Sequence, residues 1–130
     1  MAWNNGYIPQ SEIEVKVTEK SVDFAKEFGT YLGTGSEKEK LTTNQLRKFF
    51  GEVKRQQMEG YNSTRFILLK PKLAYAVGRA NNQNAKINDF YRVIANAIDR
   101  VHDESQFKNF VQIFEAIVAY HKAAEEKIDL

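Results

Sequence analysis

Apolar side chains recur at every third or fourth position along most of this chain, and only two prolines, Pro9 and Pro71, interrupt it. That spacing is the period of one face of an α-helix, whereas proline ends or kinks a helix because it lacks the backbone N–H. No stretch alternates apolar and polar residues for long enough to predict a β-strand. The sequence therefore predicts an all-α protein, a compact bundle of about five helices.

Local signals set the expected bounds of these helices. Thr42, followed three residues later by Gln45, forms a capping-box pattern, and Asp103 with Gln106 has the same spacing ahead of the last helix. Clusters of glycine, asparagine and serine separate the periodic segments. We expect helices over residues 18–32, 42–59, 65–69 continuing into 71–80, 86–101 and 105–126. Short connections between them favour antiparallel neighbours.

The size of the chain fits one domain. Its 130 residues suffice for a single hydrophobic core and are too few for two comfortable ones. The 42% apolar content, with 12% aromatic residues, argues against wholesale disorder. Residues 1–17, which include Asn4, Gly6 and Pro9, are expected to form a flexible N-terminal leader. Residues 18–130 are expected to form a single helical-bundle domain.

Several functional classes find no support in the sequence. The chain has no cysteine, which excludes disulfides, thiolate metal sites and a cysteine nucleophile. Its start lacks the basic region and apolar run of a secretion signal. No stretch approaches the roughly 18 apolar residues that span a bilayer. We therefore expect a soluble cytoplasmic protein that does not contact a membrane.

Charge is strongly segregated along the chain, although the net charge is only +2. Residues 41–80 hold eight basic side chains against two acidic ones, a local charge of +6, and residues 1–40 and 81–130 carry −2 each. A basic block between acidic segments indicates a polyanionic partner such as nucleic acid. Seven of the eight basic residues are the candidate RNA-binding residues: Arg47, Lys48, Lys54, Arg55, Lys70, Lys72 and Arg79.

These cations differ in their positions on the helices. By helical angle, Arg47 and Lys54 lie on the flank of an apolar stripe, whereas Lys48 and Arg55 lie on the opposite, solvated side. A lysine or arginine beside an apolar stripe packs its aliphatic part on the stripe and keeps its charged group in water. This arrangement suits sequence-independent contact with phosphates. The ordinary interpretation is that they are solvated helix residues. Arg65, the eighth basic residue, is equally suited to capping or local pairing.

The helix after Pro71 carries Lys72, Tyr75 and Arg79 on one face, at positions i, i+3 and i+7. Tyr75 either stacks on a ribose or base or covers the edge of the core, and we favour the core edge. Gly78 either permits the close approach of a helix or phosphate or is a tolerated surface glycine.

Neither histidine has the neighbours of a catalytic or metal site. His102 is followed by two acidic residues, and His121 precedes Glu125 by four positions. No second histidine lies at i+4, and no His-Glu-x-x-His motif is present. Residues 33–36 (GTGS) lack the spacing and the Lys-Ser/Thr pair of a phosphate loop. We therefore expect no catalytic residue, no metal site and no cofactor; a small ribonuclease that uses His102 is the enzymatic alternative.

Two basic motifs carry a resemblance to a known family. Residues 41–49 (LTTNQLRKF) and 68–79 (LLKPKLAYAVGR), with the later patterns Phe90…Ile98 and Phe107…Ala116, resemble the small subunit of type III-A CRISPR effector complexes. The resemblance covers roughly residues 40–125 and is specific in the two basic motifs. The small subunit of the type III-B complex is the close alternative, and the Lys-Pro-Lys-Leu-Ala-Tyr motif favours III-A.

The resemblance implies a helical, non-catalytic protein that stacks in several copies as a filament inside a guide-RNA complex for antiviral defence. Its partners would be the guide RNA, the target RNA and the backbone and large subunits of the complex. Because base pairing supplies specificity in such a complex, its protein lining is expected to hold backbone phosphates. The alternative from another class is a protein-binding helical adaptor without direct RNA contact.

Overall fold

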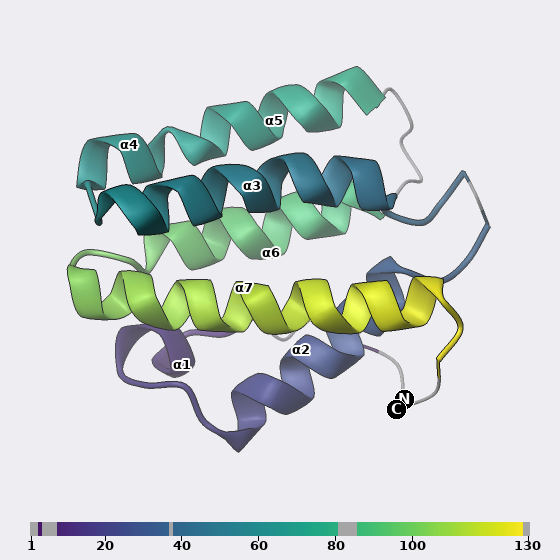
Figure 1. Cartoon of the computed structure of the whole chain (residues 1–130), viewed down its shortest axis with the longest axis horizontal. Helices are drawn as coiled ribbons and strands as arrows, with labels where there is room; N and C mark the ends of the chain where they lie inside the picture. Colours follow the sequence, from purple (N-terminus) through teal and green to yellow (C-terminus); the bar gives the residue numbers. More distant parts are fainter. Residues whose placement is uncertain (1–2, 4–7, 37, 81–85, 129–130) are drawn as a thin grey trace.

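The computed structural model describes residue 3 and residues 8–36, 38–80 and 86–128. This part of the chain forms seven helices and no strand (Figure 1). They are α1 (Ser11–Glu14), α2 (Glu19–Leu32), α3 (Thr43–Glu59), α4 (Ser63–Ile67), α5 (Leu69–Ala80), α6 (Ile87–Asp99) and α7 (Glu104–Glu125). The all-α prediction is confirmed, with the short helices α1 and α4 beside five long ones. None of the helices in these ranges is both long enough and apolar enough to cross a membrane.

Local capping sets where two of the long helices begin. The Thr42 hydroxyl accepts the Gln45 backbone N–H at 3.2 Å, and the Gln45 side chain accepts the Thr42 N–H at 2.9 Å. This pair is the predicted capping box of α3. Asp103 caps α7 by accepting the Gln106 N–H at 2.8 Å. Both starts therefore follow from residues close together in the sequence.

Some details differ from the sequence prediction: α1 was not expected, and α4 begins and ends two residues earlier than the expected range 65–69. α5 begins at Leu69, two residues before the expected start, and Pro71 still lies in its first turn, where a missing N–H lacks an intrahelical partner anyway. Val22, an apolar residue within the expected helix 18–32, is 44% exposed. The reason is that α2 turns the face of Phe24 and Phe28 toward the bundle instead.

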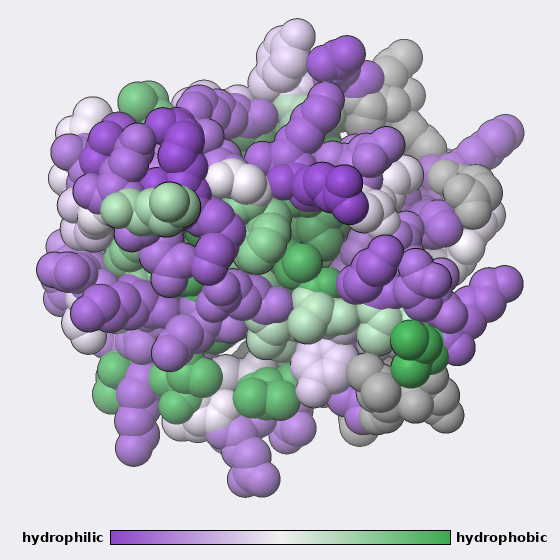
Figure 2. All heavy atoms as spheres, viewed as in Figure 1, coloured by the Kyte–Doolittle hydropathy of each residue, from purple (hydrophilic) through white to green (hydrophobic). Residues whose placement is uncertain are grey.

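α7 runs through the middle of the bundle. In Figure 1, α3 lies on one side of α7 and α2 on the other, and α5 lies beyond α3. The rings of Phe49 (α3), Phe90 (α6) and Phe114 (α7) meet in the core, with centroids 5.4, 5.8 and 6.0 Å apart. The main packing partners of α5 are α4 and α6, which makes it an outer helix. Figure 2 shows the molecule from the same side as Figure 1. Hydrophilic side chains cover most of this side, and a hydrophobic area lies near its centre.

The described part of the leader packs against the bundle. Trp3 is 6% exposed, with its ring against α2. Ile13 of α1 is 1% exposed, and Asn109 of α7 donates to its carbonyl at 2.9 Å. Residues 1–2 and 4–7 of the predicted flexible leader lie outside the described residues. Trp3 and Ile13 of the leader thus pack on the bundle, whereas Val15 is 69% exposed.

Candidate nucleic-acid interface

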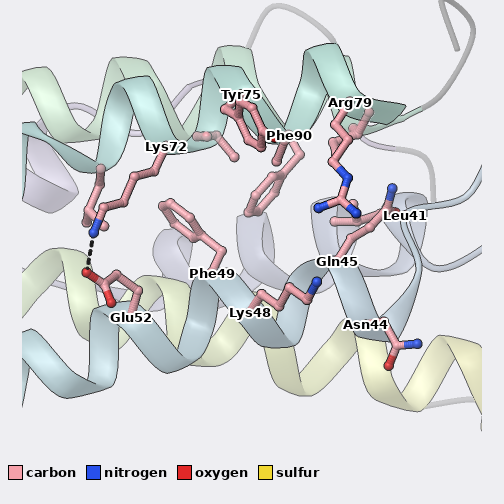
Figure 3. A pocket seen from close by; sticks show the side chains of 14 residues that line it. Leu41, Asn44, Gln45, Lys48, Phe49, Glu52, Lys72, Tyr75, Arg79 and Phe90 are labelled. Carbon is pink, nitrogen blue, oxygen red and sulfur yellow. Dashed lines mark hydrogen bonds and ion pairs between the residues drawn. The ribbon is translucent and has the colours of Figure 1, made fainter. Parts of the chain in front are cut away.

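A groove opens between α3 and α5 (Figure 3). α3 packs mainly on α7, and α5 packs mainly on α6 and α4. The facing sides of α3 and α5 therefore leave a cavity of about 530 Å³. Its floor consists of buried apolar side chains: Leu41, Phe49, Leu69, Leu73, Ile87 and Phe90. A cavity of this volume is typical of sites that hold small ligands.

Three of the seven predicted RNA-binding cations line this groove, namely Lys48 of α3 and Lys72 and Arg79 of α5. Figure 3 shows Arg79 extending from α5 toward α3, and the Lys48 side chain lying on the α3 side of the same space. Within the described part of the chain, neither Lys48 nor Arg79 forms an ion pair with a carboxylate. The groove thus joins an apolar floor to two cations, Lys48 and Arg79, that have no carboxylate partner among the described residues.

The position of Lys48 corrects the helical-angle prediction, which put it on the far, solvated side of α3. Gln56 is buried, whereas Phe50 is only half-buried. The buried stripe of α3 therefore includes Gln56 in place of Phe50. At about 100° per residue, this replacement moves the centre of the stripe by about 30° toward Lys48. The Gln56 amide donates to the Arg65 carbonyl at 3.2 Å, which gives the buried side chain a partner. Lys48 therefore reaches the groove.

Glu52 places an anion beside these cations. Its carboxylate contacts Arg55 Nη2 at 2.6 Å and Lys72 Nζ at 2.8 Å. Hydrogen bonds from Arg55 and then from Lys72 lower the pKa of Glu52 to about 2, so this carboxylate is ionised at neutral pH. Arg55 also contacts Glu59 at 3.4 Å and stays on the solvated side of α3, as predicted. The charge of Lys72 is therefore partly offset within the molecule.

Arg55 and the other three predicted cations lie outside the groove. Lys54 Nζ is 2.7 Å from Glu115 of α7, and Lys70 Nζ is 2.7 Å from Asp99 of α6. Arg47 is exposed and lies seven residues before Lys54, on the same flank of α3. Cations therefore lie on both flanks of α3. The structure brings together three of the seven predicted residues.

Tyr75 stands on the rim of the groove and is 71% exposed. The favoured interpretation of this residue, a tyrosine covering the edge of the core, is wrong. The reason is that α5 is an outer helix, so only one of its sides meets the bundle. A Cβ at Gly78 would meet nothing within 4 Å, which makes Gly78 a surface glycine in the described fold.

The apolar floor of this groove and its acidic residue, Glu52, were not predicted from the sequence. Leu69 and Leu73 have ordinary core spacing, and nothing in that spacing indicates that their far side borders a cavity. Glu52 is one of only two acids in the basic block, and that isolation was the available signal for a specific role. Its partner Lys72 lies 20 positions away, so the contact depends on the packing of two helices.

His121 has a structural contact. It is buried, and its Nε2 lies 2.7 Å from the Leu41 carbonyl, which joins α7 to the residue before the α3 cap. His102 is exposed just ahead of α7. Among the described residues, no group of three or more His, Cys, Asp or Glu side chains is arranged to hold a metal ion.

The chain matches a known protein family. The family model described as Csm2 Type III-A matches residues 16–127. The chain belongs to the Csm2 type III-A family. Membership of Csm2, a structural small-subunit family, implies a small subunit of a type III-A CRISPR complex. Comparison with curated proteins and with solved structures gave no match.

The Csm2 match confirms the resemblance that the two basic motifs carry. It includes all seven predicted cations and every residue that lines the groove. Residues 1–15, most of the predicted leader, lie outside it. The groove therefore lies within the part of the chain that the family model matches.

Proposed function

We propose that this Csm2 family member is a non-catalytic, RNA-binding small subunit of a type III-A CRISPR interference complex in antiviral defence. Several copies stack along the guide–target RNA duplex, beside the backbone and large subunits, and hold it through backbone phosphates. The observation that carries this proposal is the rim of the α3–α5 groove, where Lys48 and Arg79 have no carboxylate partner among the described residues.

Phosphate contact suits these cations. Their attraction to phosphate does not depend on base sequence, and base pairing between guide and target supplies specificity. Lys72 joins them although it pairs with Glu52, because its side chain is 59% exposed. An exposed ion pair contributes at most about 1 kcal/mol, so a phosphate is able to replace the carboxylate.

The number of groove cations predicts how RNA affinity depends on salt. Three phosphate contacts per copy give a slope of about −2 to −3 in a plot of log affinity against log salt concentration. One copy therefore binds weakly. Repeated copies along one duplex raise the affinity by multivalency.

Charge reversal tests this assignment. The double variant Lys48→Glu, Arg79→Glu should lose retention of an RNA duplex on a filter at low salt, because both cations without internal counter-ions become repulsive. The matched control is Lys20→Glu, Lys108→Glu, which changes the net charge equally at exposed positions on α2 and α7, outside the groove. Circular dichroism should show unchanged helicity in both variants.

Each result separates the candidate functions. If only Lys48→Glu, Arg79→Glu loses retention of the RNA duplex, the result supports the groove as the RNA-binding site. Equal loss in both variants means that only overall charge matters, and the groove assignment is then wrong. If the wild-type protein itself shows no salt-dependent retention, the protein-binding adaptor is the better hypothesis.

A further inference from the structure

We infer that the α3–α5 groove is a pocket for one unpaired nucleotide of RNA, with its base on the apolar floor and its phosphate at Lys48 and Arg79. This inference rests on the proposed function, because it names the part of the RNA that the groove receives. It adds contact with a base to the phosphate contacts that the proposed function requires.

The floor offers the type of surface on which bases stack. Phe49 and Phe90 meet edge to face with ring centroids 5.8 Å apart, and Leu69 and Leu73 are buried at the same floor. Tyr75 adds a largely exposed ring at the rim. Because every base has a π-face, stacking on such a surface tolerates any sequence. A guide-directed complex needs that tolerance.

The rim supplies the charge that a nucleotide requires. Lys48 and Arg79 come from opposite walls of the groove, as Figure 3 shows. An arginine guanidinium binds a phosphate with two parallel hydrogen bonds, and a lysine contributes a compact positive charge. An apolar floor between two cations is complementary to a flat aromatic group that carries an anion. A nucleotide is such a group.

The charge pattern favours a nucleotide over an acidic peptide. Figure 3 shows Lys72 and Glu52 toward one end of the groove and Arg79 toward the other. A peptide segment lying along the whole groove would bring its carboxylates past Glu52, which is ionised at neutral pH. A single nucleotide needs only the end with Lys48 and Arg79. The base must be unpaired, because the edges and faces of a paired base are covered by its neighbours.

The test compares two RNAs on the full-length protein: a perfectly paired duplex, and the same duplex with one extra unpaired 2-aminopurine. Ala76→Phe fills the groove from an exposed position on α5 without changing charge. Ala74→Phe is the matched control, exposed on the same helix but outside the groove. Circular dichroism checks that both variants fold.

We expect the wild type and Ala74→Phe to bind the duplex with the unpaired base at least roughly fivefold more tightly, the lower bound for stacking of one base. Ala76→Phe should bind both RNAs equally and retain the affinity for the paired duplex. Tyr75→Ala should lose part of the preference. The fluorescence of 2-aminopurine should change on binding to the wild type, because the base exchanges its neighbours in the duplex for the groove floor, and should not change with Ala76→Phe.

The contrary outcomes are distinct. Equal affinity of the wild type for both RNAs, or a preference that survives in Ala76→Phe, overturns the nucleotide pocket and leaves the proposed function standing. Absence of salt-dependent binding to either RNA overturns the proposed function itself. If Ala76→Phe keeps the preference but fails to enter the assembled complex, the groove is a protein-docking site and the inference is wrong.

Discussion

Glu52 determines how much positive charge the α3–α5 groove offers to a ligand. It is the acid that holds Lys72 on the groove side and Arg55 on the solvent side of α3. Its pKa of about 2 means that it competes with phosphate at every physiological pH. One carboxylate thus acts as an internal counter-ion for two of the seven candidate cations.

Removing this charge should strengthen RNA binding. Glu52→Gln keeps the shape of the side chain but removes the carboxylate that competes with phosphate for Lys72. RNA affinity at low salt should rise by up to roughly fivefold, which corresponds to the about 1 kcal/mol of an exposed ion pair. Filter binding at low salt measures this affinity.

Glu115→Gln is the control for that measurement, because Glu115 pairs with Lys54 outside the groove. Its effect on RNA affinity should be smaller. Equal affinities of Glu52→Gln and the wild type would show that Lys72 does not reach phosphate.

At the scale of elements, α2 and α7 pack with almost no space between their backbones. A Cβ at Gly29 would lie 2.6 Å from the Ile117 carbonyl oxygen, and one at Gly33 would lie 2.8 Å from the His121 carbonyl oxygen. Gly29 lies in the last turn of α2, and Gly33, four residues later, is the C-cap of the helix, so both face α7. This close approach requires glycine at both positions, because the nearest atoms that a Cβ would meet are backbone oxygens of α7.

A methyl group at this contact should therefore destabilise the fold. We expect Gly29→Ala to lower the free energy of unfolding by about 1–3 kcal/mol, the usual cost of overpacking. Gly51→Ala in α3 is the control, since a Cβ there meets nothing within 4 Å. It should raise stability by up to about 1 kcal/mol through helix propensity. Urea denaturation measures both, and a Gly29→Ala variant as stable as the wild type would refute the close contact.

At the scale of the whole molecule, Lys86 joins segments that are far apart in the sequence. Its amine donates to the carbonyls of Tyr31 at 2.7 Å and Thr34 at 2.9 Å, at the C-terminal end of α2. The same amine lies 4.2 Å from the centroid of the Tyr31 ring. Since α6 starts at the next residue and supplies Ile87 and Phe90 to the groove floor, this junction also helps to position the groove.

Loss of the junction should cost stability. Lys86→Met removes two charge-assisted hydrogen bonds, and we expect the free energy of unfolding to fall by about 1–2 kcal/mol, because water partly replaces them. Lys20→Met, at an exposed position of α2, should stay within about 0.5 kcal/mol of the wild type. Chemical denaturation distinguishes them; equal midpoints for the two variants would contradict a role for Lys86.

Most of the helices, and only part of the candidate site, were predictable from the sequence. The starts of α3 and α7 depend on pairs three residues apart, Thr42 with Gln45 and Asp103 with Gln106, so local pattern suffices. Lys72, Tyr75 and Arg79 share a face of α5 for the same local reason. Lys48 could not be placed, because the burial of Gln56 depends on a contact with the backbone of α4.

The sequence by itself determined the helical class, the capped starts of α3 and α7, and the basic block with its family motifs. These properties depend on neighbours along the chain and on composition. Only the tertiary structure decided that α3 and α5 leave an apolar groove between them and which cations surround it. Packing directions and helix rotation come from contacts between distant residues, so the same seven charges could have been distributed differently on another arrangement of the same helices.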